Sequence, residues 1–258
     1  MTGTDRLLEK THRQARRLVF GALEFPRAAH EFGTMLAAMP LLASAPRAKG
    51  RRLVLVIPGM SGGNGSTTAV RSYLQSLGHS VHGPRFAANK GAPERVARCI
   101  AEQVVDMAAQ HDQRVALVGW SVGGCIAREV AKRHPGQVDQ VITLGAPLGS
   151  TRRALSDRSA ATPDRTPGLL APGFAALSVP STVIYSRSDG VFDWRRYPQD
   201  EGPYSENIEV HGSHMGMAHH PAVMRIVADR LGQPLGRWTP YRRELRWLFP
   251  APPAAAAA

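Results

Sequence analysis

The chain has 258 residues, of which 43% are hydrophobic and 20% are charged. This length is ample for one domain with a sizeable core, and the composition excludes wholesale disorder. Two cysteines are too few for a disulfide scaffold or a four-cysteine zinc site. No apolar run approaches the roughly 20 residues that span a bilayer. We therefore expect a soluble, single-domain protein.

The net charge of +12 is concentrated at the two ends of the chain. Residues 1–52 carry ten Lys or Arg and four Asp or Glu, residues 225–258 carry six and two, and the middle is nearly neutral at 16 and 14. The sequence has no zinc-finger, helix-turn-helix or RNA-binding motif, so we expect no specific nucleic-acid partner. Basic ends on a neutral body favour weak association with an anionic membrane surface.

Residues 1–50 predict two helices, at about 4–22 and 29–43, the second with apolar residues at helical spacing. We expect these helices to pack on the domain; the alternative is a helix that rests on a membrane and guides an apolar substrate inward. Charges interrupt the first apolar stretches, which is not typical of a signal peptide. We expect a cytoplasmic protein, with peripheral membrane contact as the alternative. The sequence does not predict an oligomeric state.

From residue 51 onward, strands and helices alternate. The patterns predict strands at 53–57, 79–82, 115–118, 138–144, 182–185 and 208–210, and helices at 66–77, 92–111, 122–133 and 221–231. Such alternation builds a parallel sheet sandwiched by helices, with chemistry at the carboxyl ends of the strands. We expect one α/β domain over 51–235, followed by a C-terminal extension at 236–258 with a disordered Pro/Ala tail.

A candidate nucleophile follows the buried strand at 115–118. The segment Gly119-Trp120-Ser121-Val122-Gly123 has the pattern G-x-S-x-G and directly precedes a helix. The glycines permit the sharp strand-to-helix turn that raises a serine hydroxyl above a sheet. The sequence therefore predicts Ser121 as a nucleophile.

A serine needs a base to take its proton and a carboxylate to orient that base. Asp189 lies in the first turn after the strand at 182–185, and Asp193, one turn further on, is the alternative. His214 lies in a glycine-flanked loop between the last strand and the last helix, and His211 is the alternative. The order Ser121, Asp189, His214 suits this architecture. The histidines there lack companion carboxylates at ligand spacing, so we expect no metal and no cofactor.

Acyl transfer also needs donors for the oxyanion that develops in the transition state. The backbone amide of Val122 is one candidate, because it begins a helix directly after the nucleophile. The second is expected from the glycine-rich loop 58–63, where the amide of Met60 is our choice and Ser61 is the alternative.

The sequence resembles the α/β-hydrolase family, specifically small bacterial lipase-like and esterase-like members. The matching stretches are 54–59 (VLVIPG), 117–124 (LVGWSVGG), 142–147 (ITLGAP), 185–190 (YSRSDG) and 212–216 (GSHMG). The resemblance implies Ser121 as nucleophile, His214 as base and Asp189 as acid. It departs from the family where Pro58-Gly59 replaces the His-Gly of many lipases. Helices replace the usual N-terminal strand hairpin, so we expect about six strands, mostly parallel. Family members often carry a lid where this chain has 148–178, here a short cap or an inert connection.

The leading functional hypothesis is hydrolysis of a small-molecule or lipid carboxylic ester through an acyl-serine intermediate. An acyltransferase or thioesterase would use the same three residues, and the sequence does not separate these activities. A non-catalytic binding module on the same fold is a further alternative, although such modules usually lose one of the three residues.

Overall fold

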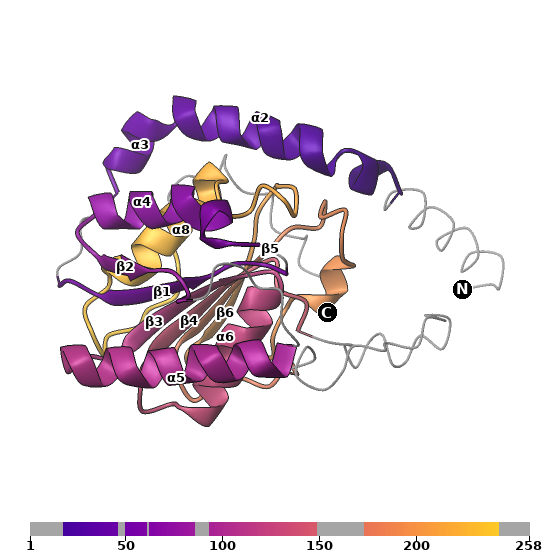
Figure 1. Cartoon of the computed structure of the whole chain (residues 1–258). Helices are drawn as coiled ribbons and strands as arrows, with labels where there is room; N and C mark the ends of the chain where they lie inside the picture. The colour runs from indigo at the N-terminus through magenta and orange to yellow at the C-terminus, as the bar shows by residue number, and fades with distance from the viewer. Residues whose placement is uncertain (1–17, 46–49, 61, 86–92, 149–172, 243–258) are drawn as a thin grey trace, which may run out of the picture.

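The computed structural model describes residues 18–45, 50–60, 62–85, 93–148 and 173–242 (Figure 1). Four expectations from the sequence fall wholly or mainly outside these ranges: the first helix over most of its length, the Ser61 alternative, most of the cap segment, and the Pro/Ala tail.

The core of the protein is a six-stranded parallel sheet with strand order β2-β1-β3-β4-β5-β6. The strands are β1 (Leu53–Ile57), β2 (Ser80–His82), β3 (Val115–Trp120), β4 (Val138–Leu144), β5 (Ser181–Tyr185) and β6 (Ser205–Glu209). Every residue of β1, β3, β4 and β5 is buried, as expected for a sheet covered on both faces. The predicted parallel sheet of about six strands is confirmed.

Helices cover both faces of the sheet (Figure 1). Helices α5 and α6 lie on one face, α4 and α8 lie on the other, and α2 and α3 form a further layer outside α8. The helices are α2 (Glu24–Ala37), α3 (Met39–Ala43), α4 (Thr68–Ser76), α5 (Pro93–His111), α6 (Val122–Arg133) and α8 (Pro221–Gly232). Alternation along β1 divides the core, because Val54 and Val56 pack toward α4 and α8 whereas Leu53, Leu55 and Ile57 pack toward α5 and α6.

Two predicted boundaries are wrong. Helix α2 begins at Glu24 rather than 29, and residues 39–43 form a separate helix after a turn at Ala38. Pro26 lies in the first turn of α2, where the missing N–H removes no intrahelical bond, so this proline does not break the helix. Strand β6 starts at Ser205 rather than 208, because this edge strand opens with polar residues that carry no apolar signal.

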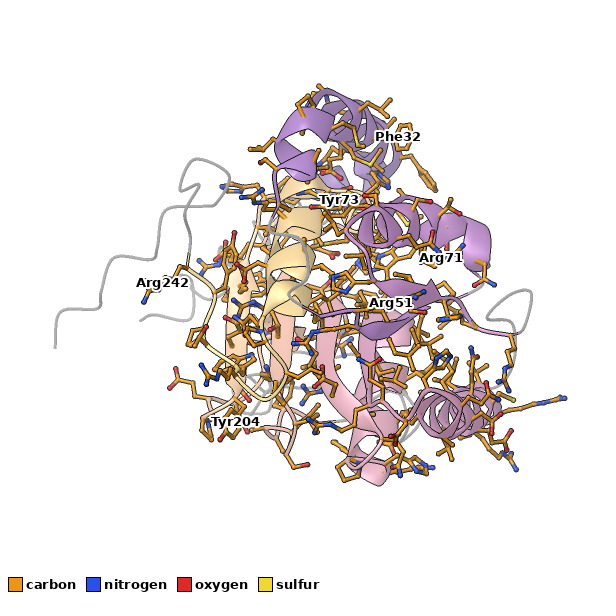
Figure 2. The ribbon with its side chains drawn as sticks, turned by 90° about the vertical axis from the view of Figure 1, so that its left-hand side faces the viewer. Phe32, Arg51, Arg71, Tyr73, Tyr204 and Arg242 are labelled. Carbon is orange, nitrogen blue, oxygen red and sulfur yellow. The ribbon has the colours of Figure 1, made fainter. Side chains whose placement is uncertain are left out.

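The outer layer is bonded to the helices beneath it. The Tyr73 hydroxyl of α4 donates to the Leu42 carbonyl (3.1 Å), and Arg225 of α8 donates to the Leu41 carbonyl (3.2 Å). In Figure 2, Phe32 of α2 lies above Tyr73, on the opposite side of the molecule from Tyr204. Across the described ranges, no helix combines the length and apolar character that crossing a membrane requires.

Candidate active site

Ser121 occupies the turn between β3 and α6 with a strained backbone. Its φ of 54° and ψ of −126° lie in a region that non-glycine residues rarely adopt, and its N–H donates to the Leu144 carbonyl (2.8 Å). The turn is tight enough that a Cβ on Gly123 would lie 2.4 Å from the Ile57 carbonyl oxygen. Glycine is therefore required where the start of α6 meets the end of β1.

Ser121, His214 and Asp189 are joined by two hydrogen bonds. His214 Nε2 lies 3.0 Å from Ser121 Oγ, and His214 Nδ1 lies 2.7 Å from Asp189 Oδ2. All three side chains are buried. Because a carboxylate only accepts hydrogen bonds, the proton between His214 and Asp189 belongs to Nδ1, which leaves Nε2 free to accept from the serine hydroxyl.

The loop after β5 separates the two candidate acids. Asp189 Oδ1 accepts from the N–H groups of Val191 (2.8 Å) and Phe192 (3.0 Å), which leaves Oδ2 for His214. Asp193 instead accepts from the Arg195 N–H (3.1 Å) and caps the short 3₁₀ helix η3 (Trp194–Arg196). The structure thus brings Asp189 to the histidine and gives Asp193 a local capping contact.

The alternative base, His211, is exposed, whereas His214 packs between two aromatic rings. The Phe192 ring lies edge-on to His214 with centroids 5.3 Å apart, and the Trp120 ring lies at 6.3 Å on a tilt. The indole Nε1 of Trp120 also donates to the His214 carbonyl (3.1 Å). Trp120, next to Ser121, therefore holds the backbone of His214.

The two candidate amide donors border Ser121. Val122 is the first residue of α6, whose N-terminal amides have no intrahelical acceptor. A Cβ on Gly59 would lie 3.4 Å from Ser121 Cβ, so the loop after β1 passes beside the serine and carries Met60 with it. Within the described residues, neither the Met60 nor the Val122 N–H donates a hydrogen bond.

A buried tyrosine lies near the acid. Burial first, and then the charge of the Asp189 carboxylate, raise the pKa of Tyr197 well above its ordinary value. The Tyr197 side chain is fully buried, so it stays neutral at physiological pH and adds no charge beside Asp189.

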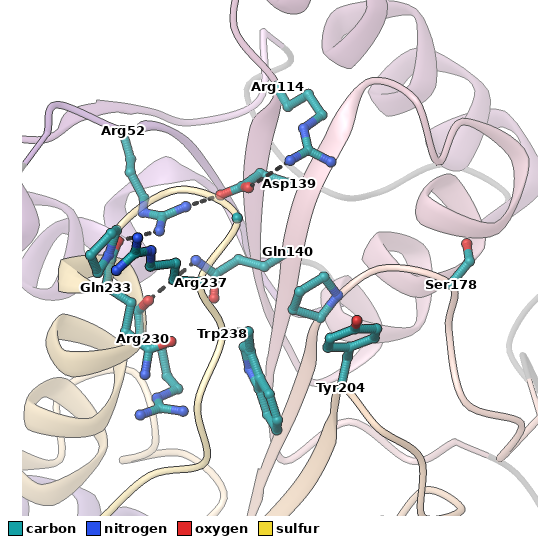
Figure 3. A pocket seen from close by; sticks show the side chains of 13 residues that line it. Arg52, Arg114, Asp139, Gln140, Ser178, Tyr204, Arg230, Gln233, Arg237 and Trp238 are labelled. Atoms are coloured by element: carbon teal, nitrogen blue, oxygen red, sulfur yellow. Dashed lines mark hydrogen bonds and ion pairs between the residues drawn. The ribbon is translucent and has the colours of Figure 1, made fainter.

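A hollow of about 180 Å³ lies at the other end of the sheet, among arginines, Asp139, Tyr204 and Trp238 (Figure 3). Asp139 in this hollow bonds to Arg52 and lies 3.6 Å from Arg114. The described residues contain no cluster of three or more His, Cys, Asp or Glu side chains arranged to hold a metal ion.

The fold and the order of these residues agree with a known family. A profile of the alpha/beta hydrolase fold matches residues 53–181, half of the chain. The chain belongs to the α/β-hydrolase family. No match was found among curated proteins.

Solved structures of other α/β-hydrolases are similar at low identity. Aspergillus fumigatus lipase B superposes with a TM-score of 0.54 and 19% identity over 74% of this chain and 55% of its own. The chain thus spans little more than half the length of lipase B. The thioesterase domain from the curacin biosynthetic pathway gives 0.49 and 14% over 70% and 91%. A metagenomic α/β-hydrolase from Mar Chica lagoon sediments, Morocco, gives 0.48 and 20% over 70% and 90%.

In this α/β-hydrolase, sequence reasoning missed the contribution of the N-terminal segment. Glu24 and Glu31 of α2 are buried and accept hydrogen bonds from the loops that carry Asp189 and His214. The available signal was their spacing: two acidic residues seven apart lie on one side of a helix. The sequence does not indicate that this side of the helix packs against the domain.

Proposed function

We propose that this α/β-hydrolase cleaves carboxylic esters through an acyl-serine intermediate. The supporting observation is the continuous chain of hydrogen bonds from Ser121 Oγ through the His214 ring to Asp189 Oδ2. A serine hydroxyl becomes a competent nucleophile when a positioned imidazole accepts its proton.

The proposed reaction has two halves. Ser121 Oγ attacks the ester carbonyl carbon while His214 Nε2 takes the hydroxyl proton, and the same proton then passes to the departing alcohol oxygen. A water molecule next attacks the acyl carbon, again losing its proton to His214, and the carboxylic acid leaves as Ser121 regains its proton. Asp189 holds the Nδ1–H tautomer and stabilises the imidazolium in both halves.

Two backbone amides are proposed to bind the oxyanion, those of Val122 and Met60. Both border the serine from different elements, so they can converge on an oxygen attached to the same carbon. Amides that are already oriented stabilise developing charge without reorganisation, and losing one such donor typically costs about 10²–10³ in kcat.

The decisive experiment measures hydrolysis of nitrophenyl esters with acyl chains of two to sixteen carbons. Ser121→Ala removes the nucleophile, so we expect kcat to fall by at least about 10⁴. The matched control is Ser178→Ala, an exposed serine beside the arginine-lined hollow, which is expected to keep full activity. An absence of turnover by folded wild type, or turnover that persists without Ser121, would overturn ester hydrolysis.

The same assay includes acyl thioesters and an added alcohol as acceptor, because acyl transfer would use the same three side chains. Turnover confined to thioesters, or a new ester formed with the alcohol in preference to free acid, would replace ester hydrolysis by the corresponding activity.

We propose further that α2 meets an anionic lipid surface from which an apolar ester is drawn. Helix α2, the residues directly before it and the first residue of α3 expose large apolar side chains: Leu18, Val19, Leu23, Phe25, Phe32, Leu36 and Met39. The acidic residues of the described segment 18–45 are Glu24 and Glu31, and both are buried against the body of the protein. Residues 1–52 carry a net charge of +6, which complements an anionic membrane.

Vesicle sedimentation tests this surface. Wild type is expected to sediment with phosphatidylglycerol vesicles more than with phosphatidylcholine vesicles, and Leu18→Ser/Phe25→Ser, which changes side chains 71% and 73% exposed, is expected to lose most of this binding. Leu235→Ser, 54% exposed at the opposite end of the sheet, is the control. Equal loss in the control, or self-association of wild type through this face, would contradict the proposal.

A further inference from the structure

Helix α2 buries two carboxylates against the body of the protein. Glu24 and Glu31 are 4% and 8% exposed and lie on the same side of the helix, since seven residues make about two turns. Burying a carboxylate is costly unless hydrogen bonds replace its lost hydration. The hydrogen-bond donors to Glu24 and Glu31 therefore show which parts of the protein these carboxylates hold in place.

Glu24 joins two loops that are distant in sequence. Its Oε1 accepts from the Gly190 N–H (2.8 Å), and its Oε2 accepts from the Met215 N–H (2.9 Å). Gly190 follows Asp189 directly, and Met215 follows His214 directly. One carboxylate thus fixes the peptide after the proposed acid and the peptide after the proposed base.

Glu31 holds the other side of the histidine. Its Oε1 accepts from the Ser213 N–H (2.7 Å), and its Oε2 accepts from the Ser213 hydroxyl (2.5 Å). The same hydroxyl accepts from the Gly216 N–H (3.0 Å). The peptide before Ser213 and the peptide after His214 are therefore both anchored to α2.

We propose that Glu24 and Glu31 are positioning residues that set the geometry of His214 and Asp189 toward Ser121. The proposal rests on the function proposed above and extends it to the N-terminal segment, which lies outside the α/β sandwich. The geometry of Ser121, His214 and Asp189 is then complete only when α2 is packed against the loops after β5 and β6.

The N-terminal segment packs closely against the loops that contain Gly190 and Gly216. A Cβ on Gly216 would lie 1.6 Å from Glu31 Oε2, and a Cβ on Gly190 would lie 2.4 Å from the Phe20 carbonyl carbon. Arg27, between the two glutamates, donates to the Ser188 carbonyl (2.6 Å) and hydroxyl (2.9 Å). The glycines that flank Asp189 and His214 thus leave room for the N-terminal segment as well as for turns.

Misplacing a catalytic group by about 1 Å can cost about 10²-fold in rate, so loss of either anchor should be measurable. Replacement of Glu by Gln keeps the size of the side chain and one acceptor oxygen. At position 24 the new NH₂ group faces an N–H donor, so one of the two hydrogen bonds is lost. At position 31 the NH₂ group faces the Ser213 hydroxyl, so a charge-assisted hydrogen bond to a carboxylate is replaced by a weaker neutral one in which the hydroxyl must accept.

The test is the rate at which a fluorophosphonate modifies Ser121. Serine Oγ bonds to phosphorus, fluoride leaves, and His214 accepts the serine proton, so the reaction reports on activation of Ser121 without needing the natural substrate. For Glu24→Gln and Glu31→Gln we expect kinact to fall roughly 10- to 100-fold with KI nearly unchanged. The control is Glu102→Gln, an exposed glutamate on α5, for which no change is expected.

Two further variants separate positioning from a general loss of fold. Glu31→Asp keeps the charge and both acceptor oxygens and is expected to recover part of kinact. Ser213→Ala combined with Glu31→Gln is expected to be little slower than the slower single variant, because both changes act on the same contact between residue 31 and the Ser213 hydroxyl. Circular dichroism and Tm verify folding in every case.

The outcomes distinguish the two proposals. Wild type that reacts with the phosphonate but cleaves no ester would overturn the proposed substrate class and leave the positioning role open to the same measurements. Glutamine variants that fold and label at the wild-type rate would overturn the positioning role, whatever the substrate. Losses of kinact that disappear once the rates are corrected for the folded fraction would also overturn it and assign these glutamates to stability alone.

Discussion

The two ends of the parallel sheet bury charge in opposite ways. At the carboxyl ends of the strands, Asp189, Glu24 and Glu31 accept hydrogen bonds from neutral backbone N–H groups and from the His214 ring. At the amino ends, buried arginines pair with carboxylates, as Arg52 does with Asp139 (Figure 3). At one end, buried carboxylates are held mainly by N–H groups around His214, whereas at the other end buried arginines are held by carboxylates.

The arginine end also binds the last turn of α8 and the chain that follows it. Arg52 Nε donates to the carbonyl of Leu231 in α8 (2.7 Å), and Glu206 of β6 accepts from the N–H of Tyr241, beyond α8 (2.8 Å). Such bonds join segments that are far apart in sequence and offer no unsatisfied base to a substrate. A hollow with charged walls is therefore not by itself a reactive site; the difference is whether a nucleophile and a base face one another.

Matched substitutions of one aspartate at each end should separate activity from stability. In Asp189→Asn the amide would donate to His214 Nδ1 and force the wrong tautomer, so we expect kcat to fall about 10⁴-fold. Oδ1 would still accept from Val191 and Phe192, so stability should change little. In Asp139→Asn the buried Arg52 loses its counter-charge, and unfolding should become easier by about 3 kcal/mol with activity per folded molecule unchanged.

Urea unfolding gives the free energy of unfolding and ester hydrolysis gives kcat, both measured on the same preparations. The contrast between the two ends fails if Asp139→Asn loses activity at a temperature where it is fully folded. It also fails if Asp189→Asn keeps more than about a hundredth of the wild-type kcat.

A second test uses the acid sensitivity of the arginine end. Burial, and then the charge of Arg52, lower the pKa of His79 to about 4, and neither ring nitrogen has a hydrogen-bond partner in the described residues. Between about pH 6.5 and 4, His79 binds a proton in the unfolded chain, where its pKa is about 6.5, but not in the folded chain. Stability is therefore unaffected above about pH 6.5, falls as the pH drops toward about 4, and levels off below it.

The expected loss from His79 approaches about 1.4 kcal/mol per pH unit below pH 6 and amounts to roughly 1.5 kcal/mol between pH 6.5 and 5, because the unfolded histidine is only half protonated at pH 6.5. His79→Phe removes this titration, so its free energy of unfolding should fall less than that of wild type over the same interval. The other buried histidines titrate equally in both proteins and cancel in the comparison. Parallel pH dependences in the two proteins would show that His79 takes up its proton in the folded state.

The sequence predicted the sheet and the central residues because their signals are local. Buried parallel strands appear in the sequence as continuous apolar runs, such as 53–57. The turn around Ser121 needs glycines at fixed positions relative to the serine. Asp189 was preferred to Asp193 because it lies in the first turn after its strand, and His214 was preferred to His211 because glycines flank it.

The contribution of α2 could not be predicted, because it depends on packing between segments about 165–190 residues apart. Nothing near Glu24 or Glu31 in the sequence indicates which loops they meet. The start of α2 was misplaced for a related reason: a proline such as Pro26 can follow the end of one helix or lie in the first turn of the next, and only the tertiary fold selects between them. Local chemistry was readable from the sequence, and long-range anchoring was not.

The smallest changes in kcat and stability are expected from substitution of two tryptophans, one at each end of the sheet. Trp120 Nε1 donates to the His214 carbonyl (3.1 Å), whereas Trp238 Nε1 is buried without a hydrogen-bond partner among the described residues. Trp120→Phe leaves a buried carbonyl without its donor at the peptide that orients the base, so kcat should fall about tenfold with KM nearly unchanged. Trp238→Phe removes an unsatisfied N–H, so activity should not change and stability should hold or rise slightly. Because the substitution is the same at both positions, a tenfold loss in both variants would mean that aromatic packing, and not the bond to His214, accounts for the effect.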